Sequence, residues 1–335
     1  MPAIRHPGAK RRLVLLASAL AAIGTSLAST QAVAQAAWPS RPIRLVVPFP
    51  AGGGTDLIAR EVANKVATTQ GWSIIIDNKP GSGGNLGVDA AAKAPADGYT
   101  LVLGQTSNLA INPTLYPKLP YKPEKDLAPV GLVAQAPLVL VVAADSPYKT
   151  LAEVIAAAKA KPQALNYASS GNGTVAHLAA ELLQKQAGVK FTHVPYKGAA
   201  QGSTDLIGGQ IQMYMSSVPT LIGYIKNGKM RAIAVTSQQR TADLPNVPTV
   251  AESGYKGFEA VTWFGVAGPD GLPKEVVARL NTAFNQAIGD AEVKKKLAAQ
   301  GAEVRSSTPE QFGALIGSEI VRWGKVVQES GARVD

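Results

Sequence analysis

The sequence contains no cysteine and only three histidines in 335 residues. The absence of cysteine excludes disulfide bonds, thiolate metal sites and a cysteine nucleophile. His6 lies near the N-terminus, and the other two are His177 and His193. Two distant histidines do not make a histidine-rich metal site. We therefore expect no catalytic metal and no cofactor, and we interpret His177 and His193 as structural residues.

Charged residues are also few, at 17% of the chain, and no basic run is interleaved with aromatic residues. The chain has 33 Lys and Arg against 23 Asp and Glu. Four of the basic residues and none of the acidic ones lie in residues 1–36, which leaves 29 against 23 in the remainder. This modest, dispersed excess does not predict a nucleic-acid surface, but it favours the capture of a small anion.

The first 36 residues have the three parts of a secretory signal. Residues 5–12 are cationic, residues 13–27 are apolar, and Ala34-Gln-Ala36 is a small-x-small cleavage site before Ala37. The apolar run is shorter than the roughly 20 residues that a membrane span requires. We expect residues 1–36 to be removed on export. The Arg11-Arg12 pair leaves both the general secretory route and the twin-arginine route open.

Short apolar runs alternate with helical patterns along the remaining chain. The predicted strands are 43–48, 73–77, 99–103, 138–143, 165–168, 190–194, 211–215, 231–235 and 260–266. The predicted helices are 56–69, 86–93, 151–159, 174–186, 201–207, 219–227, 274–287, 291–300 and 309–330. Thr150-Leu-Ala-Glu153 reads as a capping box. This alternation predicts an α/β protein with largely parallel sheets.

Two segments, 133–142 and 258–268, have the pattern of passages between lobes. We therefore expect lobe 1 to comprise residues 37–137 and 262–335, and lobe 2 to comprise residues 138–261. Two lobes joined by two crossings form a hinged cleft.

The most informative stretch is Val47-Pro-Phe-Pro-Ala-Gly-Gly-Gly-Thr-Asp56. It follows an apolar strand and leads into a helical pattern, for which Thr55 or Asp56 is the expected cap. Three glycines let a ligand approach the backbone, and free N–H groups at a helix N-terminus attract anions. We interpret this loop as an anion cradle.

Three further strand-to-helix junctions share this composition of small residues and hydroxyls. They are 81–87, 104–108 and 169–174. Because ligands of open α/β sheets bind at the carboxyl ends of the strands, the four junctions together predict one pocket for carboxylate oxygens.

The enzyme motifs that the sequence suggests are incomplete or absent. Gly171-Asn-Gly-Thr-Val-Ala176 fits a dinucleotide-binding pattern, but the acidic residue expected about 20 positions later is missing. Gly223-Tyr-Ile-Lys-Asn-Gly-Lys229 resembles a Walker A loop, but it ends in Met230 and precedes a strand. The sequence also has no G-x-S-x-G elbow. We expect a binding protein and not an enzyme. The alternative is a periplasmic hydrolase or isomerase that uses Asp56 or Asp205 as a base.

Motifs along the whole chain after residue 36 resemble those of the Bug family, the extracytoplasmic solute receptors of tripartite tricarboxylate transporters. They are Pro48-Phe-Pro-Ala-Gly-Gly-Gly-Thr-Asp56, Asn78-Lys-Pro-Gly-Ser-Gly-Gly84, Asp97-Gly-Tyr-Thr-Leu101, Ser170-Gly-Asn-Gly-Thr174, Val194-Pro-Tyr-Lys-Gly198, Asp205-Leu-Ile-Gly-Gly209 and Leu244-Pro-Asn-Val-Pro-Thr249. The resemblance implies a monomeric, two-lobed periplasmic binding protein of the type II flytrap class. Its two mixed sheets would enclose a hinged cleft between the lobes.

The resemblance also implies a small carboxylate ligand that backbone amides and ordered waters hold. The ligand would be a dicarboxylate, a tricarboxylate, an aromatic carboxylate or an acidic amino acid. Carried onto this sequence, the binding residues are Phe49, Ala51, Gly52, Gly53, Thr55, Asp56, Gln105, Ser107, Ser170, Gly171, Asn172, Thr174 and Asp205. The implied partner is the membrane permease of such a transporter, with presentation of the ligand to a sensor kinase as the alternative.

Overall fold

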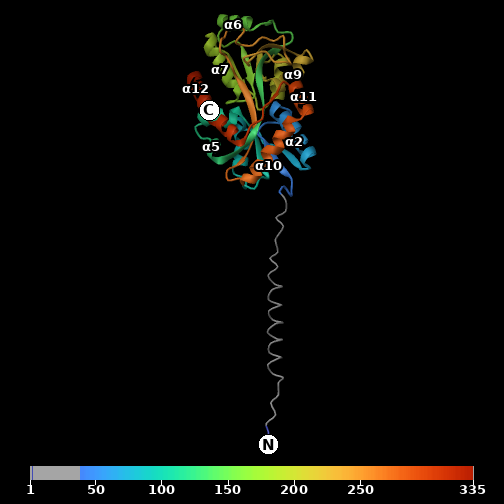
Figure 1. The fold of residues 1–335 in the computed structure, drawn as a ribbon. Coiled ribbons are helices and arrows are strands. Elements are labelled where there is room, and N and C mark those ends of the chain that lie inside the picture. The colour runs from blue at the N-terminus through green and yellow to red at the C-terminus, as the bar shows by residue number, and fades with distance from the viewer. Residues whose placement is uncertain (1, 3–37, 335) are drawn as a thin grey trace. The chain divides into compact units, whose positions relative to one another are not determined.

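The computed structural model describes residue 2 and residues 38–334. Residues 41–335 form one compact unit, and every element named below lies in it. The expected secretory signal lies, apart from residue 2, outside the described part of the chain. Figure 1 shows strands through the middle of the unit and helices around them.

The strands of the described residues form one continuous set of pairings. They are β1 (Ile43–Val47), β2 (Ile74–Asn78), β3 (Thr100–Gln105), β4 (Leu127–Ala143), β5 (Asn166–Ser169), β6 (Thr192–Pro195), β7 (Met213–Ser217), β8 (Met230–Val235), β9 (Val261–Pro269) and β10 (Glu303–Val304). Their order is β2-β1-β3-β9-β4-β7-β5-β6, and β8 and β10 also pair with β4.

The sheet is mixed. β1 is parallel to β2 and β3, and β5 is parallel to β6 and β7. β4 and β9 run antiparallel to each other and to their other neighbours. The prediction of largely parallel sheets is therefore wrong at the centre, where these two strands connect the parallel sets on either side. The expected α/β class and the mixed sheets are observed.

β4 is much longer than predicted, because only residues 138–143 were expected to be a strand. The first part of β4 pairs with β9 as far as Pro137, and the second part pairs with β7 and β8. The sequence before residue 138 contains Pro129, Gly131 and Pro137, which disfavour a regular strand. The structure accommodates the first two at a register irregularity, the kind of place where proline is tolerated in a sheet.

Each predicted helix is present to within a few residues, whereas two four-residue helices, 112–115 and 123–126, were not predicted. The helices are α2 (Gly54–Gln70), α3 (Asn85–Ala92), α4 (Asn112–Leu115), α5 (Pro123–Asp126), α6 (Leu151–Ala160), α7 (Val175–Ala187), α8 (Ala199–Ile207), α9 (Val218–Lys226), α10 (Lys274–Gly289), α11 (Ala291–Ala299) and α12 (Pro309–Ser330). The short turn η1 (Ser82–Gly84) and the π-helical turn η2 (Ser107–Ile111) were not predicted. The capping box of Thr150 and Glu153 is present, and Gly71 and Gly188 end their helices in the left-handed conformation.

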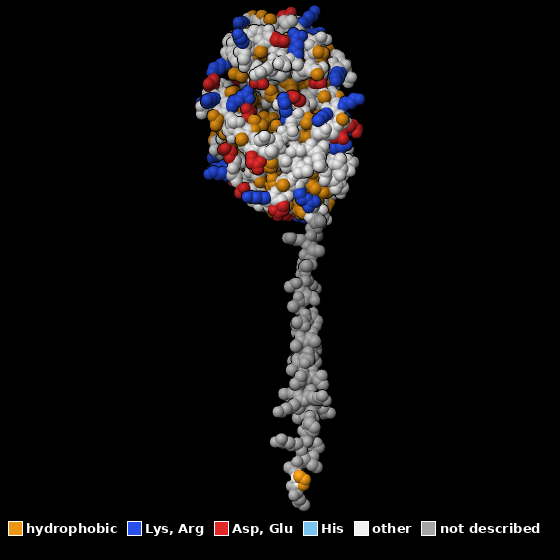
Figure 2. Space-filling model, in the orientation of Figure 1, with side chains coloured by type: hydrophobic (Ala, Val, Ile, Leu, Met, Phe, Trp, Pro, Cys, Tyr) orange, Lys and Arg blue, Asp and Glu red, His pale blue; other side chains and the backbone are white. Residues whose placement is uncertain are grey.

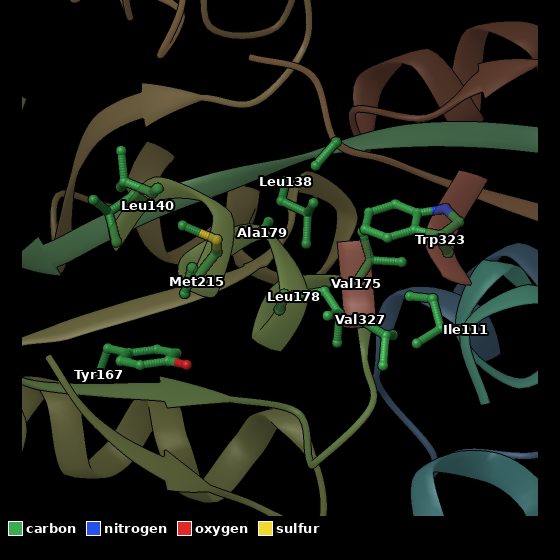
Figure 3. Close-up of a cluster of buried hydrophobic side chains, with 14 of the residues drawn as sticks. Ile111, Leu138, Leu140, Tyr167, Val175, Leu178, Ala179, Met215, Trp323 and Val327 are labelled. Atoms are coloured by element: carbon green, nitrogen blue, oxygen red, sulfur yellow. The ribbon is translucent and has the colours of Figure 1, made fainter. Parts of the chain in front are cut away.

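The C-terminal helix connects the two halves of the core. α12 packs against η2 and α4 from the first part of the chain and against α7 from the second. Figure 3 shows Trp323 and Val327 of α12 near Ile111 and Val175 in one buried cluster. α12 therefore packs both on elements of the first part of the chain, with which the sequence groups residues 262–335, and on α7.

Candidate functional site

The glycine loop follows β1, and α2 begins at Gly54 with Gly53 as its N-cap. Thr55 and Asp56, the predicted caps, instead lie in the first turn of the helix. Gly52 has a φ of +81°, a left-handed conformation that favours glycine. Gly53 has a φ of −82° and needs no such freedom.

Asp56 is buried at 2% exposure and supports the loop from within the protein. Its carboxylate accepts hydrogen bonds from the Gly52 N–H (2.9 Å), Arg60 Nε (2.9 Å) and Asn78 Nδ2 (2.9 Å). Burial alone raises the pKa of Asp56, but these hydrogen bonds outweigh it and hold the pKa below its usual value. The side chain is thus an ionised brace whose oxygens already have donors.

A small cavity of about 60 Å³, here called the inner cavity, adjoins this loop. Its lining residues are Phe49, Pro50, Gly53, Gly54, Thr55, Gln105, Leu138, Ser170, Thr174, Val175, Ala176, Gly198, Ala199, Ser216, Ser217, Thr220 and Thr262. Of these described lining residues, none has a charged side chain.

Four helices direct their N-termini at the inner cavity. The lining includes the N-cap or first residues of α2, α7, α8 and α9. A helix N-terminus carries unsatisfied N–H groups and a partial positive charge. Four such termini around one neutral cavity create an environment that favours an anion without any side-chain cation.

Side-chain hydrogen bonds fix the polar wall of the inner cavity. Thr55 Oγ1 donates to Gln105 Oε1 at 3.2 Å, and Gln105 Nε2 donates to Ser107 Oγ at 3.0 Å. Ser107 is fully buried and does not line the cavity, so its role is to orient Gln105. On the opposite wall the hydroxyl of Ser170 lies 3.4 Å from the hydroxyls of Tyr214 and Ser216.

Contacts between the two walls close the site in this structure. The Gly54 N–H donates to Thr220 Oγ1 at 3.2 Å, which joins the N-termini of α2 and α9. At the other end, Tyr116 Oη donates to the Asn172 carbonyl at 3.3 Å. These contacts connect segments 166 and 56 residues apart in the sequence.

A second cavity of about 440 Å³, here called the outer cavity, adjoins the first. It is lined by Phe49, Pro50, Pro80, Gly81, Ser82, Gly83, Gly84, Tyr116, Ser170, Gly171, Asn172, Pro195, Tyr196 and Lys197. Phe49, Pro50 and Ser170 line both cavities.

The structure brings most of the predicted binding residues together. Phe49, Gly53, Thr55, Gln105, Ser170 and Thr174 line the inner cavity, and Gly171 and Asn172 line the outer cavity. Ala51, Gly52, Asp56, Ser107 and Asp205 line neither. Asp205 accepts a hydrogen bond from Tyr196 Oη at 2.7 Å, which contributes, after burial, to raising the pKa of Tyr196 to about 12.

The sequence prediction missed several lining residues that lie at two further strand-to-helix junctions. Gly198 and Ala199 follow β6, and Ser216, Ser217 and Thr220 follow or end β7. The rule that located the other junctions applies equally here, so this signal was available. Leu138 and Thr262 on β4 and β9 had no such signal, because their place depends on the crossing of the two strands.

Two histidines lie directly behind the loop of residues 169–174. His193 stacks on His177 with ring centroids 4.3 Å apart and on Tyr167 at 4.7 Å. Ser169 Oγ lies 2.6 Å from His193 Nε2, and the Gly173 N–H donates to His177 Nδ1 at 3.3 Å. Burial lowers the pKa of both histidines, to about 3 for His193. Both rings are therefore neutral supports for the loop, as the structural interpretation of these histidines expects.

Comparison with known proteins assigns the chain to a family. The sequence profile of the tripartite tricarboxylate transporter family receptor matches residues 58–332. The chain belongs to this family. It is 42% identical over 320 residues to a Pseudomonas sp. (strain P51) protein from the tcbD-tcbE intergenic region, covering 95% of this chain and 94% of the relative. Identity to Bordetella pertussis BugT is 39% over 319 residues, covering 94% and 98% of the two chains.

Solved structures of receptors similar to this one have the same fold. R. palustris Rpa4515 with adipate has a TM-score of 0.86 and 37% identity, over 89% of this chain and all of that chain. The periplasmic binding protein BugD has a TM-score of 0.84 and 34% identity, covering 88% and 99%. MatC from Rhodopseudomonas palustris with bound malate has a TM-score of 0.82 and 33% identity, covering 87% and 100%.

These findings confirm the resemblance to the Bug family and the two-lobed binding-protein fold. The family and these neighbours are solute-binding proteins and not enzymes, so this receptor is a solute-binding protein. Among the helices of the described residues, none has the length and apolar character needed to cross a bilayer. In the same part of the chain, no three acidic or histidine side chains form a cluster suited to a metal ion.

Figure 2 shows the distribution of charge on one face of the molecule. Lys and Arg side chains are dispersed over this face, with Asp and Glu side chains between them.

Proposed function

We propose that this receptor binds a small carboxylate in the inner cavity and delivers it to the permease of a tripartite tricarboxylate-type transporter. The observation that carries the proposal is the meeting of four helix N-termini around a cavity without a charged side chain. A carboxylate fits that environment because it accepts several N–H and O–H hydrogen bonds at once. The adipate and malate named with two structural neighbours are small carboxylates.

The proposed binding residues are those of the two cavity walls. On one wall they are Phe49, Gly53, Thr55 and Gln105, and on the other they are Ser170 and Thr174. Residues that only support these walls, such as Asp56 and Ser107, act indirectly by holding the glycine loop and Gln105 in place.

We further propose the lobe boundaries expected from the sequence, with residues 37–137 and 262–335 in lobe 1 and residues 138–261 in lobe 2. The change of pairing partners in β4 after Pro137 supports them, as does the pairing of Pro137 with Val261. β4 and β9 then pass from one lobe to the other next to the same residue pair, Pro137 and Val261.

A thermal-shift screen tests the binding proposal. Purified protein is mixed with dicarboxylates, tricarboxylates, aromatic carboxylates and acidic amino acids, and the melting temperature is measured. A ligand at 100 times its Kd stabilises the folded state by about 2.7 kcal/mol, a readily detected shift. No shift with any carboxylate, confirmed by calorimetry, contradicts the proposal.

Delivery and export need separate tests. Loss of uptake of the identified ligand after deletion of the gene, restored by the intact gene, supports delivery to a permease. A lost transcriptional response with normal uptake supports the sensor-kinase alternative.

Mass spectrometry of the exported protein should give an N-terminus at Ala37, and retention of residues 1–36 contradicts the proposed periplasmic signal.

A further inference from the structure

Resting on the proposed function, we infer that Glu319 of α12 is a positioning residue for ligand binding. Together with Arg322, it holds β9 on both sides of the point where β9 passes between the proposed lobes. Glu319 itself lines neither cavity, so it acts through the strand. The part of the inner cavity that depends on it is the wall formed by Thr262 and Gln105.

Glu319 occupies a position where the pattern of α12 predicts an apolar residue. The large apolar side chains that this helix buries recur every three to five residues along one face, at Phe312, Ile316, Trp323 and Val327. Glu319 lies in the same stripe at 9% exposure, and it is the only charged residue among the buried residues of α12, a helix that the structure describes throughout. A buried carboxylate costs stability unless hydrogen bonds compensate it, so this one indicates a role beyond packing.

Three donors surround the Glu319 carboxylate. Its Oε2 accepts from Trp263 Nε1 at 3.1 Å and from Trp323 Nε1 at 2.9 Å. Its Oε1 accepts from Arg322 Nη1 at 3.0 Å, and Arg322 Nη2 donates to the Glu259 carbonyl at 3.2 Å. Trp263 belongs to β9, and Glu259 lies two residues before β9 begins. The Glu319–Arg322 pair therefore contacts the chain on both sides of the proposed lobe boundary.

Each of these two points of contact is attached to a different proposed lobe. In lobe 1, Thr106 Oγ1 accepts from the Trp263 N–H at 2.9 Å. In lobe 2, Ala260 follows Glu259 and donates its N–H to the Thr236 carbonyl at 3.0 Å, while its own carbonyl accepts from Thr236 Oγ1 at 2.6 Å. A side-chain pair that holds both points limits how far the backbone between them can rotate when the lobes move.

The segment held in this way reaches the inner cavity by two routes. Thr262 directly precedes Trp263 and lines the cavity. Thr106, which accepts from the Trp263 N–H, is fully buried and directly follows Gln105, which also lines the cavity. A displacement of Trp263 therefore moves both Thr262 and Gln105. Because Gln105 is bonded to Thr55 at 3.2 Å, the displacement also reaches the glycine loop.

Two matched tryptophan variants test the inference. Trp263 and Trp323 are both buried and donate to the same oxygen of Glu319, but only Trp263 lies on β9. Trp263→Phe and Trp323→Phe each keep an aromatic ring and remove one indole N–H. We expect Trp263→Phe to raise the ligand Kd at least about fivefold, the scale of coupling through intermediate contacts. Trp323→Phe should change the Kd by no more than about twofold. Urea denaturation of both variants separates a change of Kd from a loss of stability.

A double-mutant cycle tests the pair itself. Glu319→Gln removes the charge, and Arg322→Met removes the guanidinium group but keeps an apolar stem. We expect each variant to raise the Kd at least about threefold. The double variant should stay within about twofold of Glu319→Gln, because the two residues act as one unit. Glu310→Gln is the control and should stay within about twofold of the wild type, since Glu310 is exposed in the first turn of the same helix.

Calorimetry measures the Kd values with adipate, malate, citrate, benzoate and glutamate, and the variants are compared on the probe that the wild type binds most tightly. If the wild-type protein binds none of these probes, the proposed carboxylate site is wrong and so is this inference. If it binds one of them, and Trp263→Phe and Trp323→Phe have equal Kd values, carboxylate binding stands and the role of Glu319 is wrong. Additive losses in the double variant also overturn it. Should Glu319→Gln not fold, the two tryptophan variants decide.

Discussion

The imidazole rings of His177 and His193 stack with their planes 7° apart and their centroids 4.3 Å apart. One ring comes from α7 and the other from β6. Through the Gly173 N–H and the Ser169 hydroxyl, the pair supports the loop that forms one wall of both cavities. Protonation of either ring places a cation against its neighbour and, at His177, replaces an acceptor by a donor.

This pair predicts a loss of stability in acid. Both pKa values are lower in the folded state than the ordinary value of 6.5, so the unfolded chain binds protons first as the pH falls. Above about pH 6.5 both histidines are neutral in the folded and unfolded states and do not reduce the free energy of unfolding. Toward pH 3 this free energy decreases by at most about 1.4 kcal/mol per pH unit for each histidine. Urea unfolding at pH 7, 6, 5 and 4 measures this dependence.

His193→Phe is the diagnostic variant, because phenylalanine preserves stacking on Tyr167 and His177 but does not titrate. We expect the slope of stability against pH between 5 and 6 to decrease relative to the wild type. An unchanged slope in a folded variant shows that His193 does not remain neutral in the native state.

The glycine loop predicts a specific difference between two adjacent positions. A Cβ at Gly54 would lie 2.9 Å from Ser217 Oγ and 3.1 Å from Thr220 Oγ1, whereas a Cβ at Gly53 meets only the Pro50 carbonyl at 3.6 Å. We expect Gly54→Ala to weaken carboxylate binding at least about 10-fold by separating the N-termini of α2 and α9. Gly53→Ala, whose added Cβ meets no protein atom closer than 3.6 Å, should weaken binding less than Gly54→Ala. Calorimetry with the best ligand of the screen measures both, and equal affinities of the two variants contradict this account.

Gly54 shows where sequence reasoning succeeded and where it stopped. The three glycines and the following helix identified the loop, because backbone access and a helix N-terminus are local properties. Which glycine has neighbours too close for a side chain depends on α9, whose first turn lies 166 residues further along the chain. No local sequence pattern indicates that Gly54 lies next to the first turn of α9.

Asp56 and β4 show the same difference between local features, which the sequence predicts, and long-range contacts, which it does not. The pattern located Asp56 in the site region, but only the positions of Asn78 and Arg60 identify it as a brace. The first part of β4 was not predicted as a strand, while the structure pairs it with β9, more than 120 residues later in the chain. Strand–helix order and junction chemistry were predictable, whereas long-range pairing was not.

Replacement of Asp56 should destabilise the fold. In Asp56→Asn, an amide nitrogen replaces an oxygen that accepts from Gly52, Arg60 or Asn78, so a donor faces a donor in a buried position. We expect a loss of about 1.5–3 kcal/mol of unfolding free energy by urea denaturation at pH 7. Glu329→Gln, which breaks an exposed pair with Lys185, is the control and should cost less than about 0.5 kcal/mol. A similar loss in both variants means that the loop does not depend on Asp56.

The contacts across the site predict that ligand binding closes the molecule. Gly54 with Thr220, and Tyr116 with Asn172, join the two proposed lobes in the structure described here. A ligand that contacts both walls stabilises this closed arrangement, because it binds the open one less well. Solution scattering should therefore give a smaller radius of gyration at saturating ligand than without ligand. Gly54→Ala serves as the control, since it strains the closed contact and should show a smaller decrease at its own saturation. An unchanged radius in the wild type at confirmed saturation means that the walls are already closed without ligand, and that the hinge does not control access to the site.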